Sequence, residues 1–157
     1  MATVRGGVQG VWPITIEQTS VARYTALADT AGGFTVTTEN DAGDFQGIEF
    51  PGVVPVPAVI FYRTRQSGLP RFSVTINSVT VTAYAFTEND PPERCWHEII
   101  PAGVGGEATL KAQNNELIFG VTSDDGTGAV TFGDVVILYT SNETTIAIPL
   151  RSIGEPL

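Results

Sequence analysis

The residues whose side chains are best suited to catalysis or metal binding lie together in the segment ERCWHEII at positions 93–100. This segment holds the only cysteine of the chain, Cys95, the only histidine, His97, and one of the two tryptophans. Successive side chains of a strand point to opposite faces. Cys95 and His97 would therefore be neighbours on one face, with Trp96 and Glu98 on the other. A cysteine beside a histidine is one arrangement that activates a thiolate nucleophile.

The surroundings expected for this pair do not suit a thiolate. Such a site usually needs a helix N-terminus or cationic neighbours, and Arg94 would lie on the opposite face from Cys95. HEII begins like the zinc-protease motif H-E-x-x-H, but Pro101 stands where the second histidine would be. With one cysteine and one histidine, a structural zinc site is excluded. We interpret the segment as a strand in which Cys95 is a small buried thiol beside a hydrogen-bonded His97.

Two oxygen-rich loops are candidates for calcium. ENDAGD (39–44) and SDDGTGA (123–129) bring carboxylates and amides together with glycine turns. Neither has EF-hand spacing, and Asp, Asn and Gly are also the residues that turns require. We favour turn chemistry and keep Ca²⁺ as the alternative.

Exposed aromatic rings could stack on sugars, which have apolar CH patches. The candidates for such a glycan platform are Tyr84, Trp96 and Tyr139. Tyr84 alternates with Thr80 and Thr82, a pattern that allows it to face outward. Aromatic side chains dominate the burial of cores, so a core position is the main expectation for all three candidates.

The elements that must position these residues are strands. Val, Ile and Thr make up nearly a third of the chain, and β-branched residues favour sheets. The spacing predicts strands at 12–18, 33–39, 47–50, 58–66, 71–77, 79–87, 94–100, 108–112, 116–122, 130–140 and 144–150. The segment 19–29 would form either a short helix or a further strand.

Two details of the strand pattern are informative. Asn77 and Ser78 separate two alternating strands, which predicts a tight hairpin with a positive φ at Asn77. The run AVTFGDVVILY (129–139) is apolar on both faces towards its end, which predicts a central strand covered from both sides. The fold class we expect is all-β, a single-domain antiparallel β-sandwich that is jelly-roll-like.

Three parts of the chain are expected. They are an extended N-terminal arm at 1–11, the β-sandwich domain at 12–150 and a C-terminal tail at 151–157. The arm is weakly apolar and punctuated by glycine, so we expect it to become ordered by docking on a neighbouring subunit or protein. The residues expected to contact a partner are Thr3, Val4, Val8, Val11 and Trp12.

The charge balance excludes several classes of partner. The net charge is −9 and the isoelectric point is near 4.4, so a phosphate backbone would be repelled and we expect no nucleic acid partner. The longest apolar stretch, at 53–61, is too short for a membrane helix. The first residues lack the apolar region of a secretory signal, and a single cysteine excludes an internal disulfide.

The second half of the chain resembles a known family. RFSVTINSVTVTAYAF, WHEIIPAG and LKAQNNELIFGVTSDDGTGAVTFGDVVILY are similar to the galactose-binding-like jelly rolls of many carbohydrate-binding modules, over about 56–148. Asn115 and Leu117 match the family's "L-x-x-G-x-N-x-L" step, whose glycine is missing here. Asp134 matches a late aspartate that can hold a structural calcium with an early glutamate. The resemblance implies glycan binding, and a calcium site formed by Asp134 with Glu17.

In overall character the chain also resembles the decoration or cement proteins of tailed-bacteriophage capsids. These are acidic, disulfide-free, Thr- and Gly-rich β-domains of this size, and they are often trimeric. The first hypothesis is therefore a non-catalytic capsid decoration protein, homotrimeric, made in the host cytoplasm and located on the virion surface. The second is a lectin-like carbohydrate-binding module, cytoplasmic or exported without a recognisable signal. The third is an enzyme with a Cys–His or paired-carboxylate site.

Overall fold

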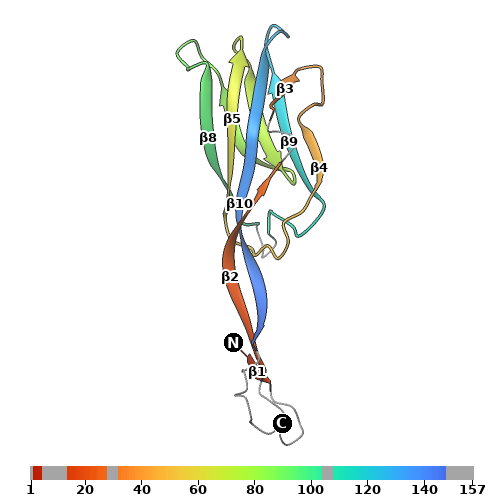
Figure 1. Cartoon of the computed structure of the whole chain (residues 1–157). Coiled ribbons are helices and arrows are strands. Elements are labelled where there is room, and N and C mark those ends of the chain that lie inside the picture. The colour runs from red at the N-terminus through yellow and green to blue at the C-terminus, as the bar shows by residue number, and fades with distance from the viewer. Residues whose placement is uncertain (1, 5–13, 28–31, 104–107, 148–157) are drawn as a thin grey trace, which may run out of the picture.

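The computed structural model describes residues 2–4, 14–27, 32–103 and 108–147. These residues form ten strands and no helix, so the all-β prediction is confirmed. The strands make two antiparallel sheets that pack against each other as a β-sandwich (Figure 1). In the described part of the chain, no helix has the length and apolar content needed to cross a membrane.

The larger sheet has six strands in the order β1-β2-β10-β5-β8, and β3 also pairs with β10. Its strands are β1 (Ala2–Val4), β2 (Ile14–Ala26), β3 (Phe34–Thr37), β5 (Ala58–Ser67), β8 (Glu93–Ile100) and β10 (Ala129–Ala147). The smaller sheet has the order β4-β9-β6-β7. Its strands are β4 (Asp44–Ile48), β6 (Arg71–Ile76), β7 (Val79–Ala85) and β9 (Asn115–Thr122).

The core lies between the two sheets and is rich in aromatic rings. The rings of Phe119 and Phe132, from opposite sheets, are 4.7 Å apart between centroids. Tyr62 stacks on Trp96 at 6.1 Å. The polar ends of these two rings are satisfied, because the Tyr62 hydroxyl lies 3.0 Å from Thr82 Oγ1 and Trp96 Nε1 donates to Thr64 Oγ1 at 2.8 Å. Burying the rings therefore leaves no polar group of theirs without a partner.

Strands β2 and β10 run on together beyond the body of the sandwich (Figure 1). β5 pairs with β10 as far as Leu138, whereas the ladder between β10 and β2 continues to Ala147. Residues 52–54 follow β10 as far as Asn142. Beyond that point β1 is the only further strand that pairs with β2 within the described residues. We call residues 15–23 of β2, paired with residues 139–147 of β10, the ribbon.

A bulge in β10 marks the change of its edge partner. The register with β5 shifts between Gly133 and Val136, and Asp134 between them has a φ of 50°. β3 pairs with β10 up to Phe132, and β2 pairs with β10 from Val136 onward. The extra residue at a bulge bends the strand and increases its twist. The bulge therefore lies at the junction of the two segments that share one edge of β10.

The hairpin between β6 and β7 is as the sequence predicts. Asn77 has a φ of 47° and Ser78 a φ of 68°, which is the pair of positive values that a two-residue hairpin turn needs. The Asn77 side chain also extends out of the turn and forms hydrogen bonds with residues outside it. Its Nδ2 donates to the Thr109 carbonyl at 2.5 Å and to Asn115 Oδ1 at 2.8 Å.

Three sequence predictions about strands need correction. Segment 19–29 is neither a helix nor a separate strand, because β2 runs through it to Ala26. The two strands predicted at 130–140 and 144–150 are one strand, β10, as far as residue 147. Residues 108–112 form no strand. The Asn115 side chain bonds both the N–H and the carbonyl of Lys111 there, which holds the backbone in a loop.

Candidate interaction surface

The outer face of the six-stranded sheet carries two rows of mainly apolar residues. Pairing in register places Ile99, Val59, Leu138 and Tyr24 in one row across β8, β5, β10 and β2. The next row lies two residues along each strand and consists of His97, Phe61, Val136 and Ala26. We call these eight residues the apolar face.

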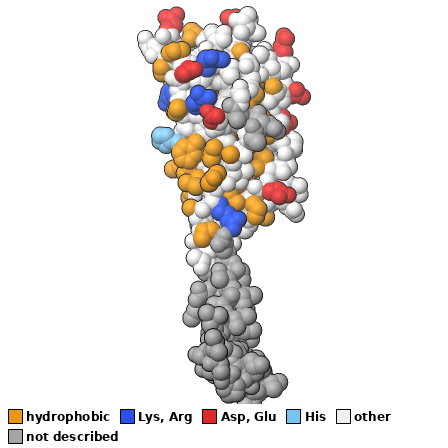
Figure 2. Space-filling view, viewed as in Figure 1, with side chains coloured by type: hydrophobic (Ala, Val, Ile, Leu, Met, Phe, Trp, Pro, Cys, Tyr) orange, Lys and Arg blue, Asp and Glu red, His pale blue; other side chains and the backbone are white. Residues whose placement is uncertain are grey.

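The apolar face is open to solvent. Tyr24 is 73% exposed, Ile99 66%, Phe61 40% and Leu138 38%. Figure 2 shows hydrophobic side chains gathered on this side of the molecule beside the single histidine. Scattered surface hydrophobics are normal, but a contiguous group of this kind usually marks a binding surface. The apolar face is therefore the candidate functional site.

Charged residues border the apolar face at the end away from the ribbon. Arg63 Nε lies 2.7 Å from Asp134 Oδ2, and both side chains are about half exposed. Arg65 and Glu93 are paired in register between β5 and β8. The two arginines and the two carboxylates have no net charge. We call these four residues the charged border.

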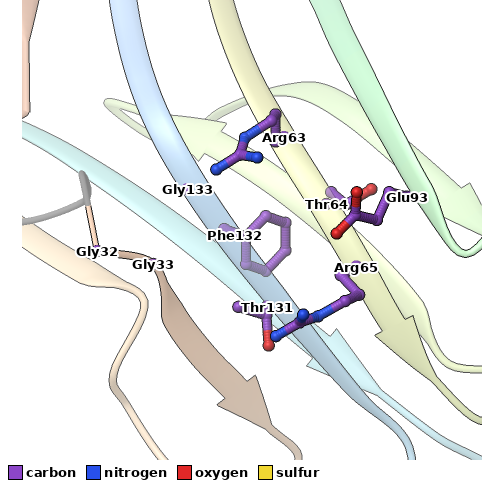
Figure 3. A pocket seen from close by; sticks show the side chains of 9 residues that line it. All are labelled: Gly32, Gly33, Arg63, Thr64, Arg65, Glu93, Thr131, Phe132 and Gly133. Carbon is purple, nitrogen blue, oxygen red and sulfur yellow. The ribbon is translucent and has the colours of Figure 1, made fainter.

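A small cavity of about 170 Å³ opens beside the charged border (Figure 3). The side chains of Arg65 and Thr131 lie next to each other there, and Gly32 and Gly33 form the opposite wall. The lining has hydroxyl, guanidinium and carboxylate groups but no cysteine or histidine.

A second hollow lies on the outer side of the four-stranded sheet, over β7, β6 and β9. It has a volume of about 500 Å³, and several of its lining residues are small, such as Ser73, Ala83 and Gly120. At its end Arg71 donates two hydrogen bonds to Asp124, at 2.7 and 2.8 Å. Arg71 is therefore already paired with a carboxylate of its own chain.

The segment ERCWHEII is one strand, β8, as predicted. Trp96 is buried, and Cys95 and His97 are exposed on the opposite side. The prediction that Cys95 is buried is wrong. β8 is an edge strand of a sheet that is covered on one face only in the described part of the chain, and Cys95 lies on the other face. Arg94 lies with its guanidinium carbon 3.8 Å from the centroid of the Trp96 ring, on the opposite face of β8 from Cys95.

The three candidate glycan-stacking rings all pack inward. Trp96 is 6% exposed and Tyr139 4% exposed, with Tyr139 against Phe50 at 5.2 Å. Tyr84 is half-buried, 5.0 Å from Trp96, and its hydroxyl donates to Asp90 Oδ1 at 2.7 Å. The outward position considered for Tyr84 is therefore wrong, and all three rings pack against other aromatic rings.

Glu17 and Asp134, the calcium ligands that the family resemblance implies, lie far apart in the structure. Glu17 is paired in register with Thr145, eleven residues beyond Asp134 along β10. At about 3.3 Å per residue, their backbones are on the order of 35 Å apart. One ion cannot bind both residues, so this pairing is wrong, and Asp134 instead pairs with Arg63.

The two oxygen-rich loops use their polar groups in turns. The Ser123 hydroxyl and the Thr127 backbone N–H and hydroxyl donate to Asp125 Oδ1, which holds the pKa of Asp125 at about 2. Asn40 Oδ1 accepts from the Thr37 N–H at 3.1 Å. Among the described residues, no group of three or more His, Cys, Asp or Glu side chains is placed to hold a metal ion.

The predicted arm lies partly outside the described residues. Thr3 and Val4 belong to β1, which pairs with residues 14–16 of β2 at the end of the ribbon. The other predicted contact residues, Val8, Val11 and Trp12, lie outside the described residues. In its described part the arm is therefore a strand of the larger sheet.

Sequence reasoning missed the apolar face, although two signals pointed to it. AVIFYR in β5 is a continuous apolar run at its start, and β10 is apolar on both sides towards residue 139. The pattern of β10 predicted a strand covered from both sides, whereas that of β5 predicted only a strand. The central position of β10 is correct, but no described segment covers its outer side, where Leu138 is exposed.

No protein-family model matches the chain, and no curated protein matches it.

Proposed function

We propose that this chain is a non-catalytic assembly module that binds protein neighbours through its apolar face. The observation that carries the proposal is the exposure of Tyr24, Phe61 and Ile99 in two adjacent rows across four paired strands. Strands that are apolar on both sides are typical of sheets covered on both faces. A protein neighbour would supply the second cover.

The ribbon supports the same proposal. Two-stranded β-ribbons are at best marginally stable in water, because neither face is buried. The ladder between β2 and β10 nevertheless continues five residue pairs past Asn142, from Glu143 paired with Thr19 to Ala147 paired with Thr15. Within the described residues, β1 lies beside only the last two of these pairs. In an assembly, a neighbouring molecule packed along the ribbon would stabilise it.

The setting that we propose is the surface of a viral capsid, with the chain acting as an oligomeric decoration or cement protein. The support is the overall character of the chain: a net charge of −9, one cysteine and a Thr- and Gly-rich β-sandwich. Apolar and edge-strand contacts would then hold it at junctions between capsid subunits. The N-terminal arm would add a second point of attachment.

Co-sedimentation tests this function. The chain is expressed together with the capsid proteins of its source virus, and the particles are separated on a density gradient. We expect the wild type to travel with the particles and Phe61→Lys to stay in the soluble fraction with an unchanged melting temperature. Leu69→Lys is the matched control, because Leu69 is 52% exposed in the turn between β5 and β6, away from the apolar face.

Two results would count against the proposal. One is a wild-type chain that associates with no particle. The other is a Phe61→Lys variant that binds as well as the wild type, which would move the interface elsewhere. A shortened chain without residues 1–11 separates the contribution of the arm, and we expect it to bind more weakly while remaining folded.

A further inference from the structure

We infer that the apolar face is covered by a second copy of this chain, an inference that rests on the proposed function and names its partner. The two copies would lie with the outer sides of their six-stranded sheets against each other. Sheets stack face to face at about 10 Å. Such contact turns the two-layered sandwich of one chain into a stack of four sheets.

The charge distribution allows a second copy to bind here despite the net charge of the chain. The chain has a net charge of −9, so two copies repel each other over most of their surfaces. The apolar face has no Asp, Glu, Lys or Arg, and His97 is its one titratable residue apart from Tyr24. In the charged border beside it, Arg63 is paired with Asp134 at 2.7 Å and Arg65 lies opposite Glu93. This side of the sheet therefore adds no local repulsion between like charges when two acidic copies approach each other.

The shape of the face also suits a second copy. It consists of two rows across four strands, and such a sheet surface is complementary to another sheet of the same twist. Packed sheets keep their strand directions within about 30° of each other. A second copy has the same twist and the same pattern of large and small side chains.

The area of the apolar face decides which segments of the chain must take part in the proposed contact. The four strands between the Ile99 row and the Glu93 row cover roughly 400 Å², taking about 4.8 Å between strands and about 3.3 Å per residue. A stable interface buries about 800 Å² per partner. The ribbon continues from the same sheet and adds roughly 300 Å² on the same measure. The proposed contact therefore includes the ribbon as well as the apolar face.

The single cysteine provides a reporter for this contact. Cys95 is exposed, and it lies two residues from His97 on the same side of β8. A second copy on the apolar face would shield its thiol. The test measures the molar mass by light scattering over a range of concentrations, and the rate at which Cys95 reacts with a thiol reagent in the same samples.

We expect the wild type to form an oligomer in which Cys95 reacts at least about tenfold more slowly than in the dilute protein, because mass action leaves few free copies at high concentration. Ile99→Lys should be monomeric with a fast-reacting thiol at every concentration. Leu69→Lys should behave as the wild type. Circular dichroism checks that both variants fold.

A wild-type chain that stays monomeric, with a Cys95 reaction rate independent of concentration, would overturn the inference. An Ile99→Lys variant with the mass of the wild-type oligomer would also overturn it. If a monomeric wild type still binds particles through Phe61, the proposed function stands and the partner is a different protein. If it binds none, both proposals fail.

Discussion

Asn115 shows how one buried amide fixes several loops at the residue scale. It is fully buried, and its Oδ1 accepts from the Lys111 N–H and from Asn77 Nδ2, each at 2.8 Å. Its Nδ2 donates to the carbonyls of Ile48 and Lys111, each at 2.7 Å. These bonds join the end of β4, the loop before β9 and the β6–β7 turn.

Asn115→Ala should therefore lower the free energy of unfolding by about 3 kcal/mol, because it leaves several buried polar groups without partners. Denaturant unfolding monitored by tryptophan fluorescence measures the change. Gln113→Ala, at an exposed position of the same loop, is the matched control and should have little effect. Equal effects from both substitutions would show that the amide network does not stabilise the loops.

Ser78 offers a stabilising change. A residue other than glycine is strained at a φ of 68°, so Ser78→Gly should raise the free energy of unfolding by about 0.5 kcal/mol. Asn77→Gly is the informative comparison, because it relieves the same kind of strain but loses the bonds to Thr109 and to the Glu116 N–H. It should destabilise the protein, and thermal unfolding distinguishes the two outcomes.

The pair formed by Tyr84 and Asp90 gives a pH dependence. The hydrogen bond between them raises the pKa of Tyr84 and lowers the pKa of Asp90. The lowered carboxyl pKa stabilises the fold above the pKa of the unfolded chain, and this stabilisation is lost as the pH falls through the folded pKa. The raised phenol pKa stabilises the fold below its ordinary value of about 10, and this stabilisation is lost as the pH rises through the folded pKa.

Asp90→Asn tests this pair through the tyrosinate absorbance of the folded protein. We expect one of the tyrosines to ionise at a lower pH than in the wild type, because the phenol has lost its anionic acceptor. The acid side of the stability profile should also become flatter. An unchanged tyrosinate titration would show that Asp90 does not control the ionisation of Tyr84.

At the scale of elements, the sequence predicts most strands because their alternation is local. β5, β6, β7, β8 and β9 lie within one or two residues of their predicted ranges. The prediction that β8 is a strand also correctly placed Cys95 and His97 side by side on one face. These features depend on the two-residue period of a strand, which any short segment displays.

Other features depend on partners that are distant in sequence. That residues 19–26 continue as a strand follows from their pairing with residues 136–143 of β10, which no local pattern reveals. Whether the outer side of β10 is covered depends on what packs against it. The sequence shows only that the strand is apolar on both sides, and this pattern alone predicted burial on both. The candidate site was missed for this reason.

Gly52 connects the body to the ribbon and provides a prediction at this scale. Its φ is 69°, and a methyl group added to it would lie 2.5 Å from Ser141 Oγ and 2.8 Å from the Asn142 carbonyl oxygen. Gly52→Ala should displace residues 52–54 from β10. Faster amide hydrogen exchange at residues 139–142 is the expected result, with β6 and β9 unchanged. Unchanged exchange at residues 139–142 would show that this segment does not support the ribbon.

At the scale of the whole molecule, the net charge of −9 should make assembly depend on salt. Repulsion between acidic copies is screened as the Debye length falls from about 30 Å at 0.01 M to about 10 Å at 0.1 M salt. The apolar face itself has no charged pair to be weakened. Added sodium chloride should therefore lower the dissociation constant of the oligomer, measured by sedimentation. Weaker assembly at higher salt would indicate that ion pairs dominate the contact.

The continuity of β10 has a mechanical consequence. This one strand lies in the middle of the six-stranded sheet and also forms half of the ribbon. A pull on the ribbon along its length would load the hydrogen bonds between β5 and β10 in shear, all of them together, because these bonds lie across the strand direction. Bonds loaded in parallel resist far more force than bonds opened one after another. A chain anchored by its ribbon would therefore hold firmly under tension.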